Sequence, residues 1–323
     1  MTDSTRDGRR STHRRTYRTA VGTLLLWGLV AAGCASDDPS SRAGATRAST
    51  TTVGAAMDAM LAARPVTVKV PPTYDPATPA PLLVLLHGYG VTGEVQNAYL
   101  KLTPVMNAHG MLEVYPDGTL NERGKRYWNA TPACCAPPRS TVDDSAYISA
   151  IIARARADYN VDPKRIFVMG HSNGGFMAYR MACDHADVVA AIVSIEGAID
   201  ADPSACSPSA PVSVLAIHGT GDDTIGYDGG RTDLSSTRYP SAPEAVRTWA
   251  KLDGCSTTPD SPAPPDRTLQ PDRPPATVTS YSTGCRPGGH AELWTQPDGV
   301  HIPPWVDSFP EQVIGFLLAH PKP

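Results

Sequence analysis

The sequence predicts an α/β fold in which helices cover both faces of a mostly parallel central sheet. Two observations support this prediction. Segments typical of strands and of helices alternate along the chain from about residue 65 onward, which is the pattern of repeated strand–helix–strand units. Two of the strand-like segments, 81–86 and 165–169, are nearly continuous apolar runs, as expected for strands that are buried on both faces.

The first half of this region contains three expected strands and one helix. Residues 66–70 alternate between apolar and polar side chains, which is typical of an edge strand. The apolar run 81–86 follows, and residues 110–115 form the next strand, which a Pro-Asp-Gly turn ends. A helical pattern then begins at Asp143 and Asp144, because apolar residues recur on one face of the segment after them.

The second half repeats the alternation. The apolar run 165–169 leads into a helix at 174–183. The later elements are strands at 190–195, 212–217 and 292–295 and helices at 244–252 and 309–318. Residues 256–276 are rich in proline, which lacks a backbone donor, so we expect a surface loop there.

Residues 1–34 have the order of charged and apolar side chains that is typical of a secretory signal peptide. A basic stretch precedes the apolar run 20–32, which is too short to span a bilayer comfortably and ends in small residues before Cys34. The last four residues, Ala-Ala-Gly-Cys, resemble a bacterial lipobox, in which the cysteine is lipidated, although Ala31 stands where leucine is usual. A cleaved signal with an incidental cysteine is the alternative, and a loose twin-arginine pattern at Arg14-Arg15 leaves the export route open.

The remainder of the chain divides into a tether and one catalytic domain. Residues 35–58 are rich in Ser, Thr, Ala and Gly without apolar periodicity, which indicates a flexible tether. Residues 59–323 are enough for one α/β core, which often uses more than about 200 residues. We therefore expect an extracellular or cell-surface protein that acts as a monomer and meets the membrane only through a lipid on Cys34.

The charge pattern argues against a nucleic-acid partner. The net charge of the chain is −4. Residues 1–34 hold six arginines and two aspartates, a local charge of +4, so the remainder carries −8 without a stripe of Lys and Arg. The chain also lacks the Cys-x-x-Cys and His-Glu-x-x-His spacings and a nucleotide-binding loop, so we expect no metal and no cofactor.

Six cysteines remain when Cys34 is set aside, and an even number in an exported protein indicates disulfide bonds. Proximity in the sequence favours Cys183–Cys206 and Cys255–Cys285, the second of which would clamp the base of the proline-rich loop. This leaves the neighbours Cys134 and Cys135. A bond between them requires a strained eight-membered ring, so that pairing stays open.

A short glycine-flanked segment supplies the first candidate for chemistry. The run Gly170-His171-Ser172-Asn173-Gly174 lies between a strand and a helix, and strand, sharp Gly-x-Ser-x-Gly turn and helix together are typical of a nucleophile elbow. A turn tight enough to project Ser172 above the sheet leaves no room for side chains at Gly170 and Gly174. The sequence therefore predicts Ser172 as a nucleophile beside a helix N-terminus, which favours a developing oxyanion.

A nucleophilic serine needs a base, and the base needs an orienting carboxylate. Asp222 follows the expected strand 212–217, at the edge of the sheet where such folds place their site residues. Asp223 is the close alternative, and a plain turn is the other interpretation of this Gly-Asp-Asp segment. We predict Asp222 as the orienting carboxylate.

The base is predicted from the direction of the last strand. His301 follows the strand 292–295 and should lie at the same end of the sheet as Ser172 and Asp222, whereas His290 precedes that strand. The sequence therefore predicts a Ser172–Asp222–His301 triad. Two further histidines are expected to pack or to form local hydrogen bonds: His171 and His218.

An oxyanion needs a second backbone N–H, which is usually supplied just after an early strand. The run Leu86-His87-Gly88-Tyr89-Gly90 has this position. We expect the N–H groups of Tyr89 and Asn173 to be the donors of the oxyanion hole and His87 to shape the loop.

Several further motifs occur in the same order as in one known family. They are Leu86-His87-Gly88, Tyr115-Pro116-Asp117-Gly118, Trp128-Asn129-Ala130, Cys134-Cys135, Val142-Asp143-Asp144, residues 170–175, residues 218–222, residues 227–230 and His301. From about residue 65 onward the chain resembles the secreted esterases grouped as polyhydroxybutyrate depolymerases and feruloyl esterases. The resemblance implies the α/β-hydrolase fold and cleavage of carboxylic esters through an acyl-enzyme on the triad named above.

The segment around the last histidine departs from this family. Members commonly have glycines before that histidine and Trp-Pro-Gly after it, whereas here Val300 precedes it and Ile302-Pro303-Pro304-Trp305 follows. The resemblance therefore does not define the shape of the substrate pocket. We interpret Trp128-Asn129 and Asp143-Asp144 as structural or pocket-wall residues.

Two other functions compete with ester hydrolysis. α/β-Hydrolase peptidases also use the Gly-x-Ser-x-Gly-Gly sequence, but they commonly carry a gating domain for which this chain has no spare segment. A surface-anchored binding protein on a hydrolase scaffold is the third hypothesis, and the presence of all three triad candidates argues against it. The sequence contains no recognisable polymer-binding module, so we expect soluble or cell-wall esters rather than solid polyester as substrates.

Overall fold

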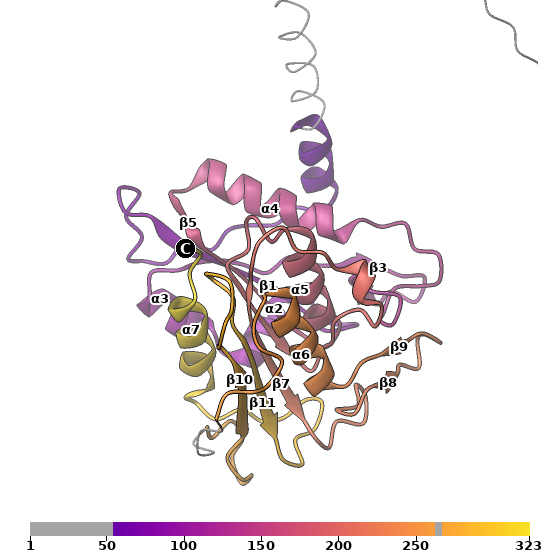
Figure 1. Cartoon of the computed structure of the whole chain (residues 1–323). Coiled ribbons are helices and arrows are strands. Elements are labelled where there is room, and N and C mark those ends of the chain that lie inside the picture. Colours follow the sequence, from indigo (N-terminus) through magenta and orange to yellow (C-terminus); the bar gives the residue numbers. More distant parts are fainter. Residues whose placement is uncertain (1–53, 262–266) are drawn as a thin grey trace, which may run out of the picture. The chain divides into compact units, whose positions relative to one another are not determined.

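A seven-stranded sheet lies at the centre of the part of the chain that the computed structural model describes, residues 54–261 and 267–323 (Figure 1). Its strands are β1 (Ala80–Leu86), β2 (Leu112–Val114), β5 (Val161–His171), β6 (Ala191–Ile195), β7 (Ser213–Gly219), β10 (Thr277–Tyr281) and β11 (Ala291–Gln296). Their order across the sheet is β10-β11-β7-β6-β5-β1-β2. Neighbouring strands are parallel except β10 and β11, which pair antiparallel at one edge. The predicted mostly parallel sheet is confirmed.

Helices cover both faces of this sheet, as predicted. They are α2 (Gly93–Leu100), α3 (Thr103–Ala108), α4 (Asp144–Asp158), α5 (Asn173–Asp184), α6 (Ala242–Leu252), α7 (Phe309–Ala319) and the 3₁₀ turn η1 (Pro203–Ala205). Side chains alternate between the two faces of a strand, so Leu82 and Val84 of β1 pack with α4, α5 and α6, while Leu83 and Leu85 pack with α3 and α7.

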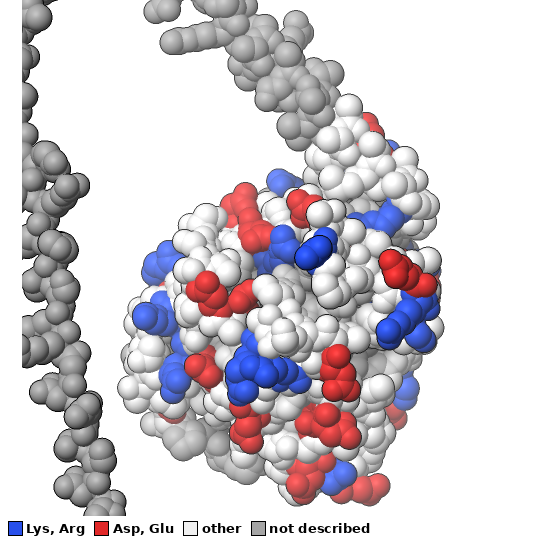
Figure 2. Space-filling model, turned by 90° about the vertical axis from the view of Figure 1, so that its right-hand side faces the viewer, with Lys and Arg blue, Asp and Glu red and all other residues white. Residues whose placement is uncertain are grey.

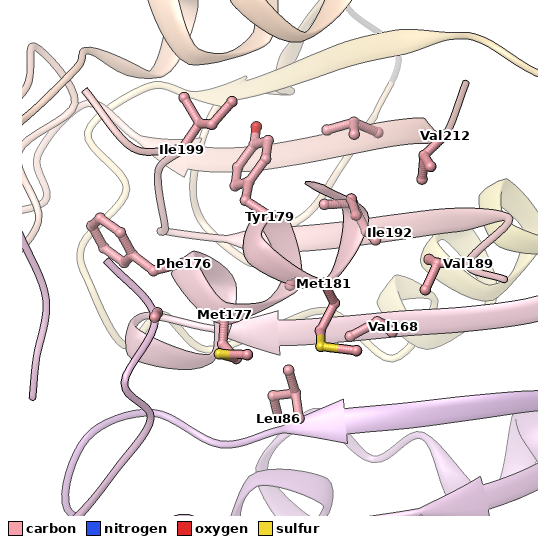
Figure 3. Packing of buried hydrophobic residues seen from close by; sticks show 14 of the residues in the cluster. Leu86, Val168, Phe176, Met177, Tyr179, Met181, Val189, Ile192, Ile199 and Val212 are labelled. Atoms are coloured by element: carbon pink, nitrogen blue, oxygen red, sulfur yellow. The ribbon is translucent and has the colours of Figure 1, made fainter. Parts of the chain in front are cut away.

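Helix α5 is packed closely against the middle of the sheet. Figure 3 shows Met177 and Met181 of α5 over the strands that carry Leu86, Val168 and Ile192. All five side chains are fully buried, and each such burial contributes about 1.5–3 kcal/mol. This packing holds the first turn of α5 rigidly at the end of β5.

Two short antiparallel ribbons lie outside the sheet. They pair β3 (Thr119–Leu120) with β4 (Arg126–Tyr127) and β8 (Gly230–Arg231) with β9 (Arg238–Tyr239). The predicted edge strand at 66–70 is wrong, because only Lys69 forms an isolated bridge there, with Glu113. Prolines at 65, 71 and 72 flank the segment and remove the donors that a longer ladder needs.

The boundary of the predicted tether at residue 58 is also wrong, because residues 54–63 form a helix. Alanine, methionine and leucine dominate this segment and favour helix. Met60 and Leu61 pack against the core, and Nη1 of Arg64 donates to Oδ1 of the buried Asp144 over 2.6 Å. The helix therefore includes residues 54–58 of the expected tether, and its contacts with the domain are made by the residues that follow them.

The predictions for residues 1–53, namely the signal peptide, the lipid on Cys34 and most of the tether, lie outside the described residues. Within the described ranges, no helix has the length and apolar character that crossing a membrane requires. Figure 2 shows acidic and basic side chains intermingled on one face of the domain, without a basic stripe on that face.

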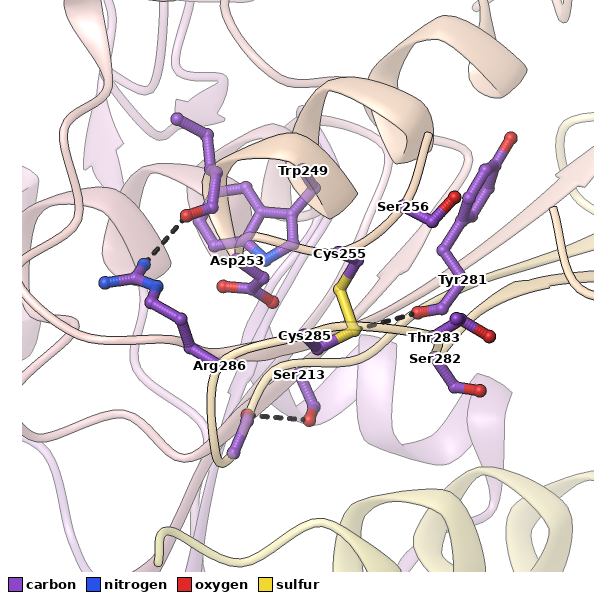
Figure 4. The surroundings of a disulfide bond; sticks show 12 residues. Ser213, Trp249, Asp253, Cys255, Ser256, Tyr281, Ser282, Thr283, Cys285 and Arg286 are labelled. Atoms are coloured by element: carbon purple, nitrogen blue, oxygen red, sulfur yellow. Dashed lines mark hydrogen bonds between the residues drawn. A yellow bond between two sulfur atoms is a disulfide. The ribbon is translucent and has the colours of Figure 1, made fainter. Parts of the chain in front are cut away.

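The structure pairs Cys183 with Cys206, Cys255 with Cys285 and Cys134 with Cys135. Figure 4 shows the second pair, which joins the end of α6 to the turn after β10, beside Trp249 and Tyr281. Disulfides are typical of proteins outside the reducing cytoplasm.

Replacing both Cys183 and Cys206 with alanine is expected to lower the free energy of unfolding. The bond closes a loop across 23 residues, and the entropy of such a loop in the unfolded chain corresponds to about 3 kcal/mol. Denaturant unfolding of the purified variant measures the loss. The matched control is the double Cys134→Ala/Cys135→Ala variant, whose bond joins adjacent residues and closes almost no loop. An equal loss in both variants would contradict the loop-entropy explanation.

Candidate active site

Ser172 occupies the sharp turn between β5 and α5, as the sequence predicts for a nucleophile elbow. Its backbone has φ 56° and ψ −121°, a conformation that costs free energy for any residue other than glycine. Two hydrogen bonds hold it there: the Ser172 N–H donates to the carbonyl of Ile195 over 2.7 Å, and the Phe176 N–H donates to the Ser172 carbonyl over 3.1 Å. Stored strain of this kind is typical of functional sites.

The two glycines of the elbow are required by close backbone contacts. A Cβ atom on Gly170 would lie 2.1 Å from the carbonyl oxygen of Gly174, and one on Gly174 would lie 2.2 Å from the carbonyl oxygen of Leu86. Neither contact involves a flexible side chain that could move aside. The local reason for Gly-x-Ser-x-Gly is therefore steric.

The three side chains of the predicted triad lie together at the carboxyl end of the sheet. Nε2 of His301 is 3.0 Å from Oγ of Ser172, and Nδ1 of His301 is 2.8 Å from Oδ2 of Asp222. The serine is 7% exposed and the aspartate side chain is fully buried. These distances connect a hydroxyl, an imidazole and a carboxylate in one hydrogen-bonded chain, which can remove a proton from the hydroxyl.

Asp222 is held by its own loop. Its Oδ1 accepts the N–H groups of Thr224 and Ile225 over 2.8 and 2.9 Å, which leaves Oδ2 for His301. Asp223, the alternative carboxylate, is exposed and accepts only the Thr224 hydroxyl. His218 donates to the carbonyl of Ile225 and so supports this loop, in keeping with the local role expected for it.

His301 lies on the loop after β11, and a second histidine holds that loop in place. Nε2 of His171 is 2.9 Å from the carbonyl oxygen of His301, and the two rings lie 5.1 Å apart. Burial lowers the pKa of His171 to about 4, so the neutral ring donates its Nε2 proton to that carbonyl. His290, the rejected candidate for the base, contacts Glu292 and packs against His320 instead.

The charges of Asp222 and His301 stabilise one another. Burial alone would raise the pKa of Asp222, but hydrogen bonds from His218 and His301 outweigh it and hold that pKa far below its usual range. Burial alone would lower the pKa of His301, but hydrogen bonds to Asp222 and Glu196 outweigh it and raise that pKa above its ordinary value. The carboxylate therefore favours the imidazolium that forms when the serine loses its proton.

The loop after β1 lies directly against the nucleophile. A Cβ on Gly88 would be 3.5 Å from the Cβ of Ser172. His87 accepts the Gly118 N–H at Nε2 and donates from Nδ1 to the Gly88 carbonyl, so its ring shapes the loop as the sequence predicts. Within the described residues, the N–H groups of Tyr89 and Asn173 have no hydrogen-bond acceptor.

Trp128 joins the Gly88 loop to the start of α5. The side chain of Asn173 accepts the Trp128 N–H over 2.7 Å and donates to the Trp128 carbonyl over 3.0 Å. The Trp128 indole donates in turn to the carbonyl of His87. Asn129 continues the network, because its backbone N–H donates to Oδ2 of Asp144 over 2.7 Å. The structural role interpreted for these residues agrees with the contacts.

Sequence reasoning missed one residue of the site, Glu196. Its Oε2 lies 3.1 Å from Nδ1 of His301, and its side chain is 1% exposed. The signal was present in the sequence, because a carboxylate directly after the buried strand at 190–195 stands at the edge of the sheet where α/β folds place site residues.

His171, Glu196 and His301 also form a cluster of potential metal ligands, with one ligand atom of each within 4.8 Å of the others. However, His301 uses both ring nitrogens in contacts with Ser172 and Asp222, and His171 donates to a carbonyl. These nitrogen atoms are therefore engaged in hydrogen bonds of the site in this arrangement.

The chain is similar in sequence to known hydrolases. A family model described as the prolyl oligopeptidase family matches residues 139–228. Feruloyl esterase B of Piromyces equi is 28% identical over 238 residues, which cover 71% of this chain and 43% of the relative. The putative esterase NocK of Nocardia uniformis subsp. tsuyamanensis is 29% identical over 164 residues, which cover 50% of this chain and 46% of the relative. The chain thus spans less than half the length of these two curated relatives.

A solved structure supports the fold independently of sequence. The acetyl xylan esterase from Aspergillus awamori superimposes with a TM-score of 0.56 at 15% identity, over 78% of this chain and 93% of that one. The strand order, the elbow and this likeness show that the chain has the α/β-hydrolase fold. Its sequence is similar to these two esterases, each over less than half of the relative's length.

Proposed function

We propose that the protein hydrolyses carboxylic esters through an acyl-enzyme on Ser172, with His301 as general base and acid and Asp222 as the orienting carboxylate. One observation carries the proposal. The hydroxyl, the imidazole and the carboxylate are joined by contacts of 3.0 and 2.8 Å at a strained strand-to-helix turn. The similarity to esterases agrees with this assignment.

The reaction proceeds in two proton-balanced halves. His301 Nε2 takes the proton of the Ser172 hydroxyl as Oγ attacks the ester carbonyl, and the same proton passes to the alcohol as the C–O bond breaks. Water then attacks the acyl-enzyme while His301 takes its proton, and that proton returns to Ser172 Oγ as the acid leaves. Asp222 stays ionised throughout and stabilises the imidazolium.

The backbone N–H groups of Tyr89 and Asn173 are the proposed donors of the oxyanion hole. The loop at Gly88 lies against Ser172, and neither N–H has an acceptor among the described residues. The Ser172 N–H cannot serve, because it donates to the Ile195 carbonyl. The N-terminus of α5 adds its positive dipole end at the same place.

The proposed substrates are soluble or polysaccharide-linked esters. A groove of about 610 Å³ is lined by Tyr89, by apolar side chains such as Leu120 and Leu234 and by polar ones such as Asn121 and Arg123, and it adjoins the site through Tyr89 rather than through a triad residue. The exposed Val300 and Ile302 flank His301 and add apolar surface. A groove of mixed character suits an ester whose two halves differ in polarity. Hydroxybutyrate oligomers remain within the proposal through the family resemblance.

Hydrolysis of a panel of esters tests the proposal. It comprises p-nitrophenyl acetate and butyrate, methyl ferulate, acetylated xylo-oligosaccharides and 3-hydroxybutyrate oligomers. We expect turnover of at least one class that disappears in Ser172→Ala. Absence of turnover on every ester by folded wild-type protein would refute it.

A peptidase is the second candidate, because the matching family model is that of the prolyl oligopeptidase family. Both reactions use the same triad and the same oxyanion donors. Peptide p-nitroanilides assayed beside the esters discriminate between them. We expect kcat/KM for the best ester to exceed that for any peptide. The opposite order would favour the peptidase.

We further propose that residues 1–34 are an export signal and that Cys34 is lipidated, which would anchor the enzyme at the cell surface. The disulfides of the domain support a location outside the cytoplasm. Metabolic labelling with a radioactive fatty acid in a bacterial host tests the anchor. Label is expected on the wild-type chain and not on Cys34→Ala, whereas an unlabelled wild-type chain that is still exported would favour a cleaved signal.

The kcat/KM for esters is expected to rise with pH through neutrality. The base is the neutral imidazole of His301, and the raised pKa of this residue keeps it protonated to higher pH than a free histidine. Below that pKa, kcat/KM falls by about tenfold for each unit of pH. Initial rates on p-nitrophenyl acetate from about pH 5 to about pH 9, corrected for spontaneous hydrolysis, give the profile. A flat profile would contradict the role of His301 as the base.

A further inference from the structure

Glu196 is a buried carboxyl group that the mechanism above leaves unused. It follows β6 directly, and its N–H donates to the carbonyl of Ile217 over 2.8 Å. Its φ of 52° lies in the left-handed region, which favours glycine over every residue with a side chain. The backbone at this position therefore favours glycine, yet it holds a long acidic side chain that is 1% exposed. Strained, buried and titratable residues concentrate at functional sites.

Glu196 and Asp222 meet the same atom of the base. Oε2 of Glu196 lies 3.1 Å and Oδ2 of Asp222 lies 2.8 Å from Nδ1 of His301. This nitrogen carries a single proton, which it donates to Asp222, and no other donor among the described residues is directed at the Glu196 oxygens. Two carboxyl groups at one nitrogen repel each other when both are ionised, so one of them holds a proton.

The contacts decide which carboxyl group is protonated. Asp222 accepts two backbone N–H groups, from Thr224 and Ile225, in addition to His301. Such bonds stabilise a carboxylate. Glu196 has no comparable donors, and burial raises its pKa to about 8. At neutral pH Asp222 is therefore ionised, while Glu196 is neutral.

Other titratable groups face Glu196 from each surrounding element. They are Asp222 after β7, which His218 contacts in turn, His301 after β11, His171 at the end of β5 and Tyr99 from α2. Burial lowers the pKa of His171 to about 4 and raises that of Tyr99 above its usual range. Neither of these two groups changes charge in the range where Glu196 does.

We propose that Glu196 is a positioning residue for His301, a second carboxyl group at Nδ1 that is neutral in the resting enzyme and adds its charge and an acceptor when it ionises. Its proton leaves to solvent, and no other group reacts. The kinetic tests of this inference rest on the proposed ester hydrolysis. The titration of His301 does not depend on it. An ionised Glu196 favours the imidazolium, so it raises the pH at which His301 becomes an effective base.

The pH profile of Glu196→Gln tests the effect of the charge. Glutamine keeps the size of the protonated acid and cannot ionise. We expect the midpoint of the rise in kcat/KM to fall by about one pH unit, which increases kcat/KM below the midpoint by about tenfold. Glu113→Gln is the matched control, since Glu113 is also buried but lies in the edge strand β2, where it accepts the Thr103 hydroxyl. A midpoint equal in all three proteins would overturn the proposal.

Removal of Asp222 tests the acceptor. In Asp222→Ala, Glu196 is the carboxyl group left at Nδ1, and it orients His301 only when ionised. We expect kcat of Asp222→Ala at about pH 9 to exceed that of Asp222→Ala/Glu196→Gln by about tenfold or more. The removal of Asp222 also removes a negative charge that raises the pKa of Glu196, so the difference should persist below about pH 8. Equal rates of the two folded variants at about pH 9 would contradict the role.

A titration that needs no activity separates this inference from the proposed function. The imidazole signals of His301 are followed by NMR in Ser172→Ala and in Ser172→Ala/Glu196→Gln. We expect a lower pKa of His301 in the second protein. If it falls while wild-type protein cleaves no ester, the proposed function fails and the inference stands. If wild-type protein is an active esterase and the pKa of His301 is unchanged, the inference fails alone.

Discussion

Ser172→Ala is expected to lower kcat on p-nitrophenyl butyrate by about 10⁴- to 10⁶-fold while the protein stays folded. The variant removes Oγ of Ser172, which lies 3.0 Å from Nε2 of His301. Without this oxygen no acyl-enzyme can form. The proposed oxyanion donors at Tyr89 and Asn173 are backbone groups that remain, and they account for a residual rate above that in water. Initial rates at saturating substrate, with circular dichroism as the check on folding, measure the effect.

Ser194→Ala is the matched control for this variant. Ser194 lies in β6 next to β5, paired with Gly170, and is 1% exposed. Its hydroxyl has no hydrogen-bond partner among the described residues. We therefore expect its loss to change kcat by less than about threefold, because the substitution breaks no specific interaction. If Ser172→Ala keeps most of the wild-type rate, or if Ser194→Ala loses as much, Ser172 is not the nucleophile.

Gly174→Ala is expected to lower the free energy of unfolding by about 3 kcal/mol or more. The added Cβ would lie 2.2 Å from the carbonyl oxygen of Leu86 and 2.8 Å from that of His87. Both are backbone atoms of β1 and the loop after it, and α5 is packed too tightly against the sheet to move away. Relief of the clash must shift the loop that carries Tyr89, so activity falls with stability. Denaturant unfolding and ester turnover measure the two losses.

Gly315→Ala provides the control for the stability effect. Gly315 lies inside α7, and nothing lies within 4 Å of the position that its Cβ would take. Alanine is preferred to glycine inside a helix by about 0.5–1 kcal/mol, so this variant should be slightly more stable than wild-type protein. A Gly174→Ala protein as stable and as active as Gly315→Ala would show that the elbow has room for a side chain, against the geometry described here.

The parts of the site that the sequence predicted are those with a local cause. The glycines of the elbow and the apolar run of β5 follow from sterics and burial within a few residues. His301 was preferred to His290 because the direction of one strand decides which end of the sheet each occupies. Such inferences need only the polarity of parallel strands.

The parts that the sequence missed depend on contacts between distant segments. Glu196 acquires its role only because β6 lies beside β7, which brings Asp222 and His301 to the same place. The edge strand β10 was missed because its five residues follow a proline-rich segment and are half exposed. Conversely, residues 66–70 alternate like a strand but have prolines on both sides. Within this segment, only Lys69 pairs with another strand, through an isolated bridge to Glu113. Periodicity alone could not decide either case.

The most direct test of the central claim is covalent labelling of the wild-type protein with a fluorophosphonate. This reagent reacts with a serine hydroxyl that a neighbouring base has activated. Intact mass spectrometry is expected to show one adduct for each chain, and peptide mapping is expected to place it on Ser172, with no adduct on Ser172→Ala. An adduct on a different side chain, or none on folded wild-type protein, would contradict the assignment of Ser172, His301 and Asp222 as a working triad.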